Sequence, residues 1–326
     1  MRRRRLGSTG LQVSEVCLGA MTFGAAAPRD EAARILDVFT DHGGDFIDTA
    51  VNYAGGASEE VLGELLHGRR DRYVLATKYS GLLAADDVRS GGNSARSLRL
   101  SLETSLRRLR TDHVDLYWVH FWDQVTPLEE IVRALDDAVT SGKVLYVGIS
   151  NTPAWAVARA ATQAELQDRA RFQAIQVEYN LTERSVEREL VPMSRALGMS
   201  VVAWGPLAGG LLTGKYALAP TDQQVRLQSG DRRFSPRNQS LVDELLTISR
   251  ELGASPAAIA FKWLLDRPAR PIPIAGARNA PQLQEQLAGL DLQLPDDLRE
   301  RLDRASEIPL GYPHDFIERL LMNRRF

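Results

Sequence analysis

Short apolar runs alternate with segments of helical periodicity along almost the whole chain. Each run is apolar at nearly every position, which is typical of parallel strands buried on both faces. Clusters of glycine, proline or polar residues separate the runs from the segments that follow. We expect eight strands, at residues 16–19, 46–47, 72–77, 114–119, 144–149, 172–177, 199–203 and 271–275.

The segments between the strands repeat apolar residues every three to four positions, which predicts helices. These are residues 29–42, 58–66, 94–109, 127–140, a helix beginning at 153, one running through 186–197, then 239–252, 256–266, 281–287 and a closing helix within 296–326. Ser58 is the expected N-cap of the second helix, and Asn93 or Ser94 that of the third. Residues 205–237 are rich in Gly, Pro, Arg and Gln and predict a long functional loop.

Eight strands that alternate with helices predict an α/β fold of the (β/α)8 or TIM-barrel type. A doubly wound open sheet is the alternative, but residues 19–24 lack the G-x-G-x-x-G spacing of its phosphate turn. Residues 2–5 and 11–13, joined by a Gly-Ser-Thr-Gly turn, predict an N-terminal β-hairpin. No break in composition marks a second domain, so residues 1–326 are expected to form a single domain.

Composition narrows the classes of protein that the chain can belong to. Its 44% hydrophobic content can supply a large core, and a net charge of −2 gives no electrostatic reason to bind nucleic acid or an anionic membrane. The basic residues 2–5 are not followed by an apolar segment, so we expect no secretory signal, and no apolar run is long enough to span a bilayer. Cys17 is the only cysteine, which excludes an internal disulfide and fits a cytoplasmic location.

Ionisable side chains recur where the predicted strands end. Asp48 follows the second strand, Lys78 the third and His120 the fourth, and Tyr53 lies in the loop after Asp48. Each has an ordinary structural explanation by itself, but the recurrence does not. The active sites of (β/α)8 barrels lie at the carboxyl ends of the strands, so we expect these side chains to meet. Later strand ends carry Asn151, Gln176, Trp204 and a turn that contains Gly276 and Arg278.

Lysine is rare in this chain, which makes its position informative. There are only four lysines, at positions 78, 143, 215 and 262, so arginine carries nearly all of the positive charge. Lysine and arginine differ most where a compact charge or an adjustable pKa is needed. A lysine kept at a strand end beside Asp48 and Tyr53 therefore indicates a chemical role for Lys78.

Seven segments, spread in order over nearly the whole chain, carry a resemblance to a known family. They are FIDTAVNY, YVLATKY, VDLYWVH, GKVLYVGISN, QAIQVEYN, WGPLAGGLLTGKY and PIAGARNAPQLQEQ. In these segments the chain resembles the aldo-keto reductase family, in particular its bacterial members related to potassium-channel β subunits. The resemblance implies a catalytic tetrad formed by Asp48, Tyr53, Lys78 and His120.

The resemblance further implies that the protein binds NADPH/NADP+. The nicotinamide would be held by Ser150, Asn151 and Gln176, with Trp204 stacked on the ring. The pyrophosphate would be covered by a loop that contributes Gly205, Pro206, Leu207, Gly209, Leu211 and Lys215. The adenosine 2′-phosphate end would be held by Gly276, Arg278, Gln282 and Gln286. Two positions depart from the family pattern, since it often has serine at position 205 and usually asparagine at position 286.

The residues also allow the chemistry to be argued. Hydride transfer to a carbonyl builds negative charge on its oxygen and requires a proton donor. A phenol with an ordinary pKa near 10 is a weak acid, but an adjacent ammonium stabilises its phenolate form. We therefore expect Tyr53 to donate the proton, Lys78 to assist, Asp48 to hold Lys78, and His120 to orient the carbonyl.

The expected function is the NADPH-dependent reduction of an aldehyde or ketone, a small-molecule substrate. The alternative is a redox-sensing regulatory subunit that binds NADPH and a protein partner. The sequence fits both a monomer and a homo-oligomer. No metal is expected, because the other histidines lack ligand spacing. Apolar residues just past the strand ends predict a pocket for a bulky apolar or aromatic substrate, formed by Met21, Phe23, Phe121 and Trp122.

Overall fold

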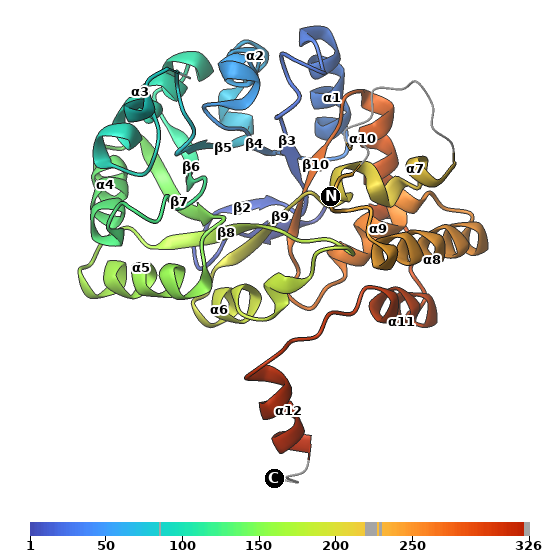
Figure 1. Ribbon diagram of the computed structural model, residues 1–326. Coiled ribbons are helices and arrows are strands. Elements are labelled where there is room, and N and C mark those ends of the chain that lie inside the picture. The colour runs from blue at the N-terminus through green and yellow to red at the C-terminus, as the bar shows by residue number, and fades with distance from the viewer. Residues whose placement is uncertain (85, 219–226, 228–229, 323–326) are drawn as a thin grey trace.

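The computed structural model contains a closed barrel of eight parallel strands surrounded by helices (Figure 1). It describes residues 1–84, 86–218, 227 and 230–322. Around the barrel the strands follow the order β10 (Ile272–Gly276), β3 (Cys17–Gly19), β4 (Phe46–Asp48), β5 (Val74–Tyr79), β6 (Val114–Val119), β7 (Val144–Ser150), β8 (Phe172–Glu178) and β9 (Ser200–Trp204). The (β/α)8 barrel expected from the sequence is confirmed.

The helices cover the outside of the barrel and bury apolar side chains against the strands. They are α1 (Arg29–Asp41), α2 (Ala57–Leu65), α3 (Ala95–Leu109), α4 (Leu128–Thr140), α5 (Ala154–Leu166), α6 (Leu190–Ala196), α8 (Pro236–Leu252), α9 (Pro256–Leu265), α10 (Ala280–Leu287) and α11 (Asp296–Ala305). Between β9 and α8 lie a 3₁₀ segment at Ala208–Thr213 and the short helix α7 (Lys215–Leu218). Most helix bounds agree with the predicted ones within a few residues.

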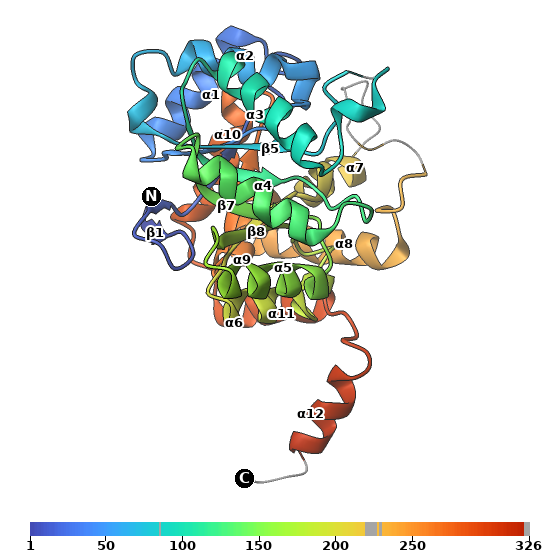
Figure 2. The same cartoon turned by 90° about the vertical axis from the view of Figure 1, so that its left-hand side faces the viewer.

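The predicted N-terminal hairpin is also present and closes one end of the barrel. Its strands β1 (Arg3–Arg5) and β2 (Gln12–Ser14) pair antiparallel, with Arg4 opposite Val13. Leu6 and Val13 are completely buried and pack on the side chains inside the barrel. Figure 2 shows β1 at one end of the molecule and α7 at the other. The opposite end, where the strands finish, is therefore the end that remains available for a site.

Alternate strand positions point into the barrel, and this alternation explains where the site lies. The lower interior is an apolar cluster that includes Phe46, Ala76, Trp118 and Ala174. Two residues further along the same four strands come Asp48, Lys78, His120 and Gln176. These polar side chains are thus the next inward-facing layer above a closed apolar floor.

Three helix boundaries differ from the prediction because tertiary contacts decide them. Ser58 is not an N-cap but lies inside α2, where its hydroxyl donates to the Ala20 carbonyl at 2.7 Å. The helix expected through 186–197 begins only at Leu190, and residues 185–187 form a separate turn in which Glu187 accepts a hydrogen bond from Tyr179 Oη at 2.6 Å. Helix α8 begins at Pro236 rather than 239, because Ser235 accepts from the amide of Asn238 and caps it.

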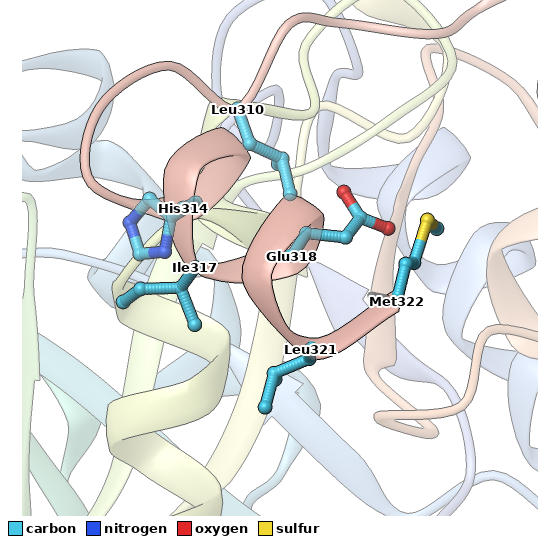
Figure 3. A pocket seen from close by; sticks show the side chains of 6 residues that line it. All are labelled: Leu310, His314, Ile317, Glu318, Leu321 and Met322. Carbon is cyan, nitrogen blue, oxygen red and sulfur yellow. The ribbon is translucent and has the colours of Figure 1, made fainter. Parts of the chain in front are cut away.

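The C-terminal helix α12 (His314–Met322) stands away from the barrel in both views (Figures 1 and 2). None of its residues is buried. Figure 3 shows side chains of this helix and of Leu310 around a hollow, which is lined among the described residues by Leu310, His314, Ile317, Glu318, Leu321 and Met322. In the described part of the chain, no helix has the length and apolar character required to cross a membrane.

Candidate active site

A cavity of about 1540 Å³ opens above the polar layer at the carboxyl ends of the strands. This volume exceeds the range of roughly 300–1,000 Å³ that is typical for a drug-sized ligand. Many of the residues predicted for the tetrad, the cofactor and the substrate line it together: Met21, Asp48, Tyr53, His120, Asn151, Gln176, Trp204, Gly205, Pro206, Leu207, Gly209, Lys215, Gly276, Arg278, Gln282 and Gln286.

Lys78 lies directly beneath this cavity and joins two of the predicted tetrad members. Its side chain is completely buried, and its ammonium forms a salt bridge with Asp48 Oδ2. The same nitrogen donates to the Thr49 carbonyl at 2.8 Å and to Tyr53 Oη at 3.1 Å. All three donor positions of the ammonium are therefore used, and one of them is the phenol.

The charges in this group support one another. Burial lowers the pKa of Lys78, but the Asp48 carboxylate and the Tyr53 phenol outweigh it, and the net shift of the Lys78 pKa is upward. Burial raises the pKa of Asp48, while Lys78 and a hydrogen bond from Gln176 Nε2 at 3.1 Å act in the opposite direction. A buried ammonium therefore stays charged, with Asp48 as its counter-ion.

His120 completes the group from the end of β6. Its ring lies edge-on to the Tyr53 ring, with 5.7 Å between the centroids and an angle of 81° between the planes. Burial, and then the charge of Lys78, lower the pKa of His120 to about 3. The imidazole is neutral at physiological pH, and its buried Nδ1 has no hydrogen-bond partner among the described residues. It can therefore act as a polar group beside Tyr53 without adding a second positive charge.

A chain of hydrogen bonds connects this group with the residues predicted to hold the nicotinamide. Asn151 Nδ2 donates to the His120 carbonyl at 2.9 Å, and Trp204 Nε1 donates to Asn151 Oδ1 at 3.2 Å. Ser150 is buried and is not among the described residues that line the cavity. Its hydroxyl oxygen has no hydrogen-bond partner among the described residues. The orientation of the Trp204 ring is thus fixed by a residue that is itself tied to His120.

The other end of the cavity is rich in cations and amides. Lys215, Arg233 and Arg278 line it, and Arg233 is held by Asp231 at 2.9 Å. The side chain of Gln282 accepts from the amide of Arg278 at 3.0 Å. In α10, Gln286 Nε2 donates to the Gly276 carbonyl at 2.9 Å. We refer to this set of residues, Lys215, Arg233, Arg278, Gln282 and Gln286, as the Arg278 end, and to the predicted tetrad as the catalytic end.

The residues present fit a phosphorylated dinucleotide. Two buried oxygens lack partners among the described residues, Ser150 Oγ near the catalytic end and Gln286 Oε1 at the Arg278 end. A buried polar atom without a partner costs about 1–3 kcal/mol, so a ligand that satisfies Gln286, which lines the cavity, would bind with that advantage. Lys215, Arg233 and Arg278 line the same cavity and match phosphate groups. Across the described chain, no cluster of three His, Cys, Asp or Glu could hold a metal ion.

Several of the predicted contacts are corrected by the structure. Phe23 is completely buried in the core, so it cannot face a substrate. Trp122 donates to the Thr126 carbonyl at 3.1 Å, and neither it nor Phe121 is among the described residues that line the cavity. Leu211 packs into the core rather than into the cavity. Met21 alone of the predicted substrate residues lines the cavity.

Sequence reasoning also missed residues that line the cavity. Arg233 lies within the predicted long loop, but only the first part of that loop was expected to bind the cofactor. Its basic character inside a glycine-rich loop was a usable signal. Thr22, Glu178 and Glu285 also line the cavity, and nothing in their sequence context pointed to them.

Comparison with known proteins places the chain in a family. The model of the Aldo/keto reductase family matches residues 15–307. The chain is 36% identical to norsolorinic acid reductase stcV from Emericella nidulans over 94% of its length and 82% of the relative's. It is 38% identical to the uncharacterized oxidoreductase YrpG from Bacillus subtilis, over 91% of this chain and 94% of that protein.

A third relative is the aryl-alcohol dehydrogenase [NADP(+)] of Phanerodontia chrysosporium, which is 32% identical over 96% of this chain and 88% of its own. The match to the family model and the identity to these relatives extend over nearly all of the barrel described above. The chain belongs to the aldo/keto reductase family.

Proposed function

We propose that the protein reduces the carbonyl group of an aldehyde or ketone with NADPH. The observation that carries this proposal is the position of Lys78 Nζ, which pairs with Asp48 and lies 3.1 Å from Tyr53 Oη beneath the cavity. NADPH, when bound, supplies the hydride. The remaining chemistry is the delivery of one proton to the carbonyl oxygen, and the residues at the catalytic end are arranged for that step.

Tyr53 is the proton donor in this proposal. Its hydroxyl faces the cavity, and the charged Lys78 behind it stabilises the phenolate that remains after proton transfer. Asp48 keeps the ammonium in place and compensates its charge. Neutral His120, edge-on to Tyr53, can donate a hydrogen bond to the same carbonyl oxygen and so define its position.

Binding of the cofactor would use the two ends of the cavity. Ser150, Asn151 and Gln176 would bind the nicotinamide carboxamide, with Trp204 against the ring. The loop that begins at Gly205 would cover the pyrophosphate. At the Arg278 end, the guanidinium of Arg278 would pair with the 2′-phosphate, because its planar fork matches a phosphate dianion. NADPH would then be preferred over NADH.

We further propose that the substrate has an aromatic body. Two observations support it. The cavity has a volume of about 1540 Å³, and the apolar side chains of Met21 and Trp204 line it together with Tyr53. In addition, one relative is an aryl-alcohol dehydrogenase. An aromatic ketone or aldehyde should therefore have a higher kcat/KM than a short polar aldehyde.

The proposed function is tested by following NADPH and NADH oxidation with a panel of aliphatic and aromatic carbonyl compounds. Steady turnover with NADPH, fastest for aromatic members, is the expected result. Tight NADPH binding without turnover of any carbonyl would contradict the proposal and favour the alternative of a redox-sensing regulatory subunit.

A further inference from the structure

A partly buried ion pair joins α2 to α3 on the outer side of the barrel, behind the catalytic end. Glu59 of α2 is completely buried, and its Oε2 lies 3.3 Å from Arg108 Nη1 of α3. Neither residue is among the described residues that line the cavity. Because Glu59 is completely buried, loss of Arg108 would leave the Glu59 carboxylate without this counter-charge.

Arg108 contacts both ends of the loop that carries Tyr53, residues 51–56. Its Nη1 donates to the Val51 carbonyl at 2.7 Å. Its guanidinium also lies against Gly56, where a Cβ would be only 2.3 Å from Arg108 Cζ. The guanidinium therefore occupies a space that exists because residue 56 is glycine, and it bridges the start and the end of this Tyr53 loop.

The Tyr53 loop has a backbone that needs such support. The three residues after Tyr53 all have positive φ, 51° at Ala54, 65° at Gly55 and 105° at Gly56. For alanine this left-handed conformation is unfavourable. Conformations of this kind persist only where the surrounding structure fixes them. Tyr53 thus precedes a segment that would relax if its outer contacts were removed.

Glu59 extends the same set of contacts to the strand that carries Lys78. Thr77 Oγ1 donates to Glu59 Oε1 at 2.7 Å, and Thr77 immediately precedes Lys78 in β5. The backbone of α3 at Arg108 is itself held closely against α2, because a Cβ on Gly63 would lie 2.2 Å from the Arg108 carbonyl oxygen. The ion pair therefore connects the Tyr53 loop with the Lys78 strand through two side chains.

We propose that Glu59 and Arg108 are positioning residues that set the separation of Tyr53 Oη and Lys78 Nζ. This inference rests on the proposed function, since it assigns the pair a role in proton transfer from Tyr53. Misplacement of a reacting group by about 1 Å can cost roughly 10² in rate. Loss of Arg108 should therefore slow the chemical step by about 10- to 100-fold while NADPH binding, at residues on other strands, changes less than about threefold.

The variants for the test are Arg108→Ala and Glu59→Gln. Glu59→Gln keeps the shape of the native side chain, so it provides the test if Arg108→Ala does not fold. The matched control is Arg70→Ala. Arg70 also pairs with a carboxylate, Asp115 at 2.6 Å, and also donates to a backbone carbonyl, that of Tyr73 at 2.8 Å. It acts at the opposite, amino-terminal end of β5, and its side chain is 15% exposed against 20% for Arg108.

Three quantities are measured on each variant: single-turnover hydride transfer, NADPH affinity and urea unfolding. Amide hydrogen exchange by mass spectrometry is followed in peptides that cover residues 49–57. Both test variants should exchange faster in those peptides and transfer hydride more slowly than the Arg70→Ala control at comparable loss of stability. Millimolar methylguanidinium should restore part of the rate of Arg108→Ala but not that of a Lys78 variant.

Hydride transfer within twofold of the native rate in Arg108→Ala, or unchanged exchange in residues 49–57, would overturn the positioning role. An equal rate loss in Arg70→Ala would do so as well, because it would reduce the effect to general destabilisation. If the native protein itself transfers no hydride, the proposed function fails, and the hydrogen-exchange comparison still decides whether Arg108 holds the loop.

Discussion

The catalytic end and the Arg278 end belong to the same cavity but are built in different ways. At the catalytic end, Lys78 is 0% and Asp48 2% exposed, and the ammonium makes three hydrogen bonds within the protein. At the Arg278 end Arg233 and Arg278 lie on loops, Lys215 is exposed at the start of α7, and the buried oxygen of Gln286 has no partner among the described residues. The Lys78 ammonium is fully paired without a ligand, whereas the buried Gln286 oxygen is not.

This difference corresponds to two roles, acting on the reacting atom and holding the cofactor. Groups that act on a reacting atom must already be in position, because reorganisation during the reaction would cost rate. Groups that only hold a ligand do not act on the reacting atom, so they can be more exposed to solvent. We therefore expect substitutions at the catalytic end to change kcat and those at the Arg278 end to change cofactor affinity. The following predictions test this separation.

Lys78→Arg should produce the largest effect. The substitution keeps the charge, but a guanidinium is larger and planar, and the ammonium is completely buried where it bonds to Asp48, the Thr49 carbonyl and Tyr53. Loss of general acid catalysis commonly costs about 10²–10⁴-fold, and we expect a decrease of that size in single-turnover hydride transfer. NADPH affinity, measured by fluorescence titration, should change much less.

The control for this change is Lys262→Arg on α9. Lys262 pairs with Asp266 one turn later, with a side chain 20% exposed, and lies outside the described lining of the cavity. It should retain the native rate. Near-native hydride transfer in the Lys78→Arg variant would remove Lys78 from the mechanism and, with it, the functional distinction of the catalytic end.

Arg278→Ala should have a large effect on the preference for NADPH rather than on the rate of hydride transfer. A charge-assisted contact to phosphate is worth about 1.5–3 kcal/mol, so the ratio of kcat/KM for NADPH to that for NADH should fall by more than tenfold. The rate of hydride transfer at saturating NADPH should be retained. NADH kinetics serve as the internal control, since this cofactor lacks the 2′-phosphate. An unchanged ratio would show that Arg278 does not bind the 2′-phosphate.

His120 links the catalytic end to the stability of the protein at acid pH. Its folded pKa of about 3 lies below the ordinary value of 6.5, so between these values the unfolded chain binds more protons. The stability contributed by neutral His120 is full above pH 6.5 and is lost as the pH falls toward 3. From pH 7 to pH 5, His120→Asn should lose less unfolding free energy than the native protein, by about 2 kcal/mol.

Urea unfolding at the two pH values measures this difference. The control is His113→Asn, because His113 lies at the surface beside Asp112. This variant removes an imidazole outside the described lining of the cavity and so reports what the loss of a histidine does away from the catalytic end. A His120 variant that is as acid-sensitive as the native protein would mean that the imidazole is not held neutral.

The strand ends could be predicted because local pattern and barrel geometry agree there. A single polar residue after an apolar run identifies Asp48, Lys78 and His120, and parallel pairing sets Asp48 beside Ala76 and Lys78 beside Trp118. The residues of the first inward-facing layer above the core can therefore be predicted from the strands alone. The same reasoning explains the agreement of the strand bounds with the prediction.

Residues outside the strands could not be placed in this way. Phe23 resembled a rim aromatic, yet the loop after β3 folds it into the core. Ser58 carried a capping signal that a contact with Ala20 overrode. Glu59 and Arg108 are 49 residues apart on two different helices, and no periodicity reveals such a contact. Loop conformation and helix-to-helix packing decide these positions, and the spacing of apolar residues along the chain predicts neither.

Gln286 provides the smallest and most selective test of the Arg278 end. It is 3% exposed, and its Nε2 is already used by the Gly276 carbonyl, so only Oε1 remains for a ligand. If that oxygen accepts from the adenine amino group, Gln286→Met should lose one neutral hydrogen bond, worth about 0.5–1.5 kcal/mol, or up to roughly tenfold in Kd. Because both cofactors carry adenine, NADPH and NADH should weaken equally, in contrast to Arg278→Ala.

Fluorescence titration with both cofactors distinguishes the possible origins of such a loss. Weaker binding of NADPH alone would mean that Gln286 acts on the 2′-phosphate through Arg278, to which Gln282 on the same helix is bonded. A lower kcat at saturating NADPH would mean that the two ends are coupled. Equal weakening with an unchanged kcat is the result that follows if the catalytic end acts on the reacting atom and the Arg278 end only binds the cofactor.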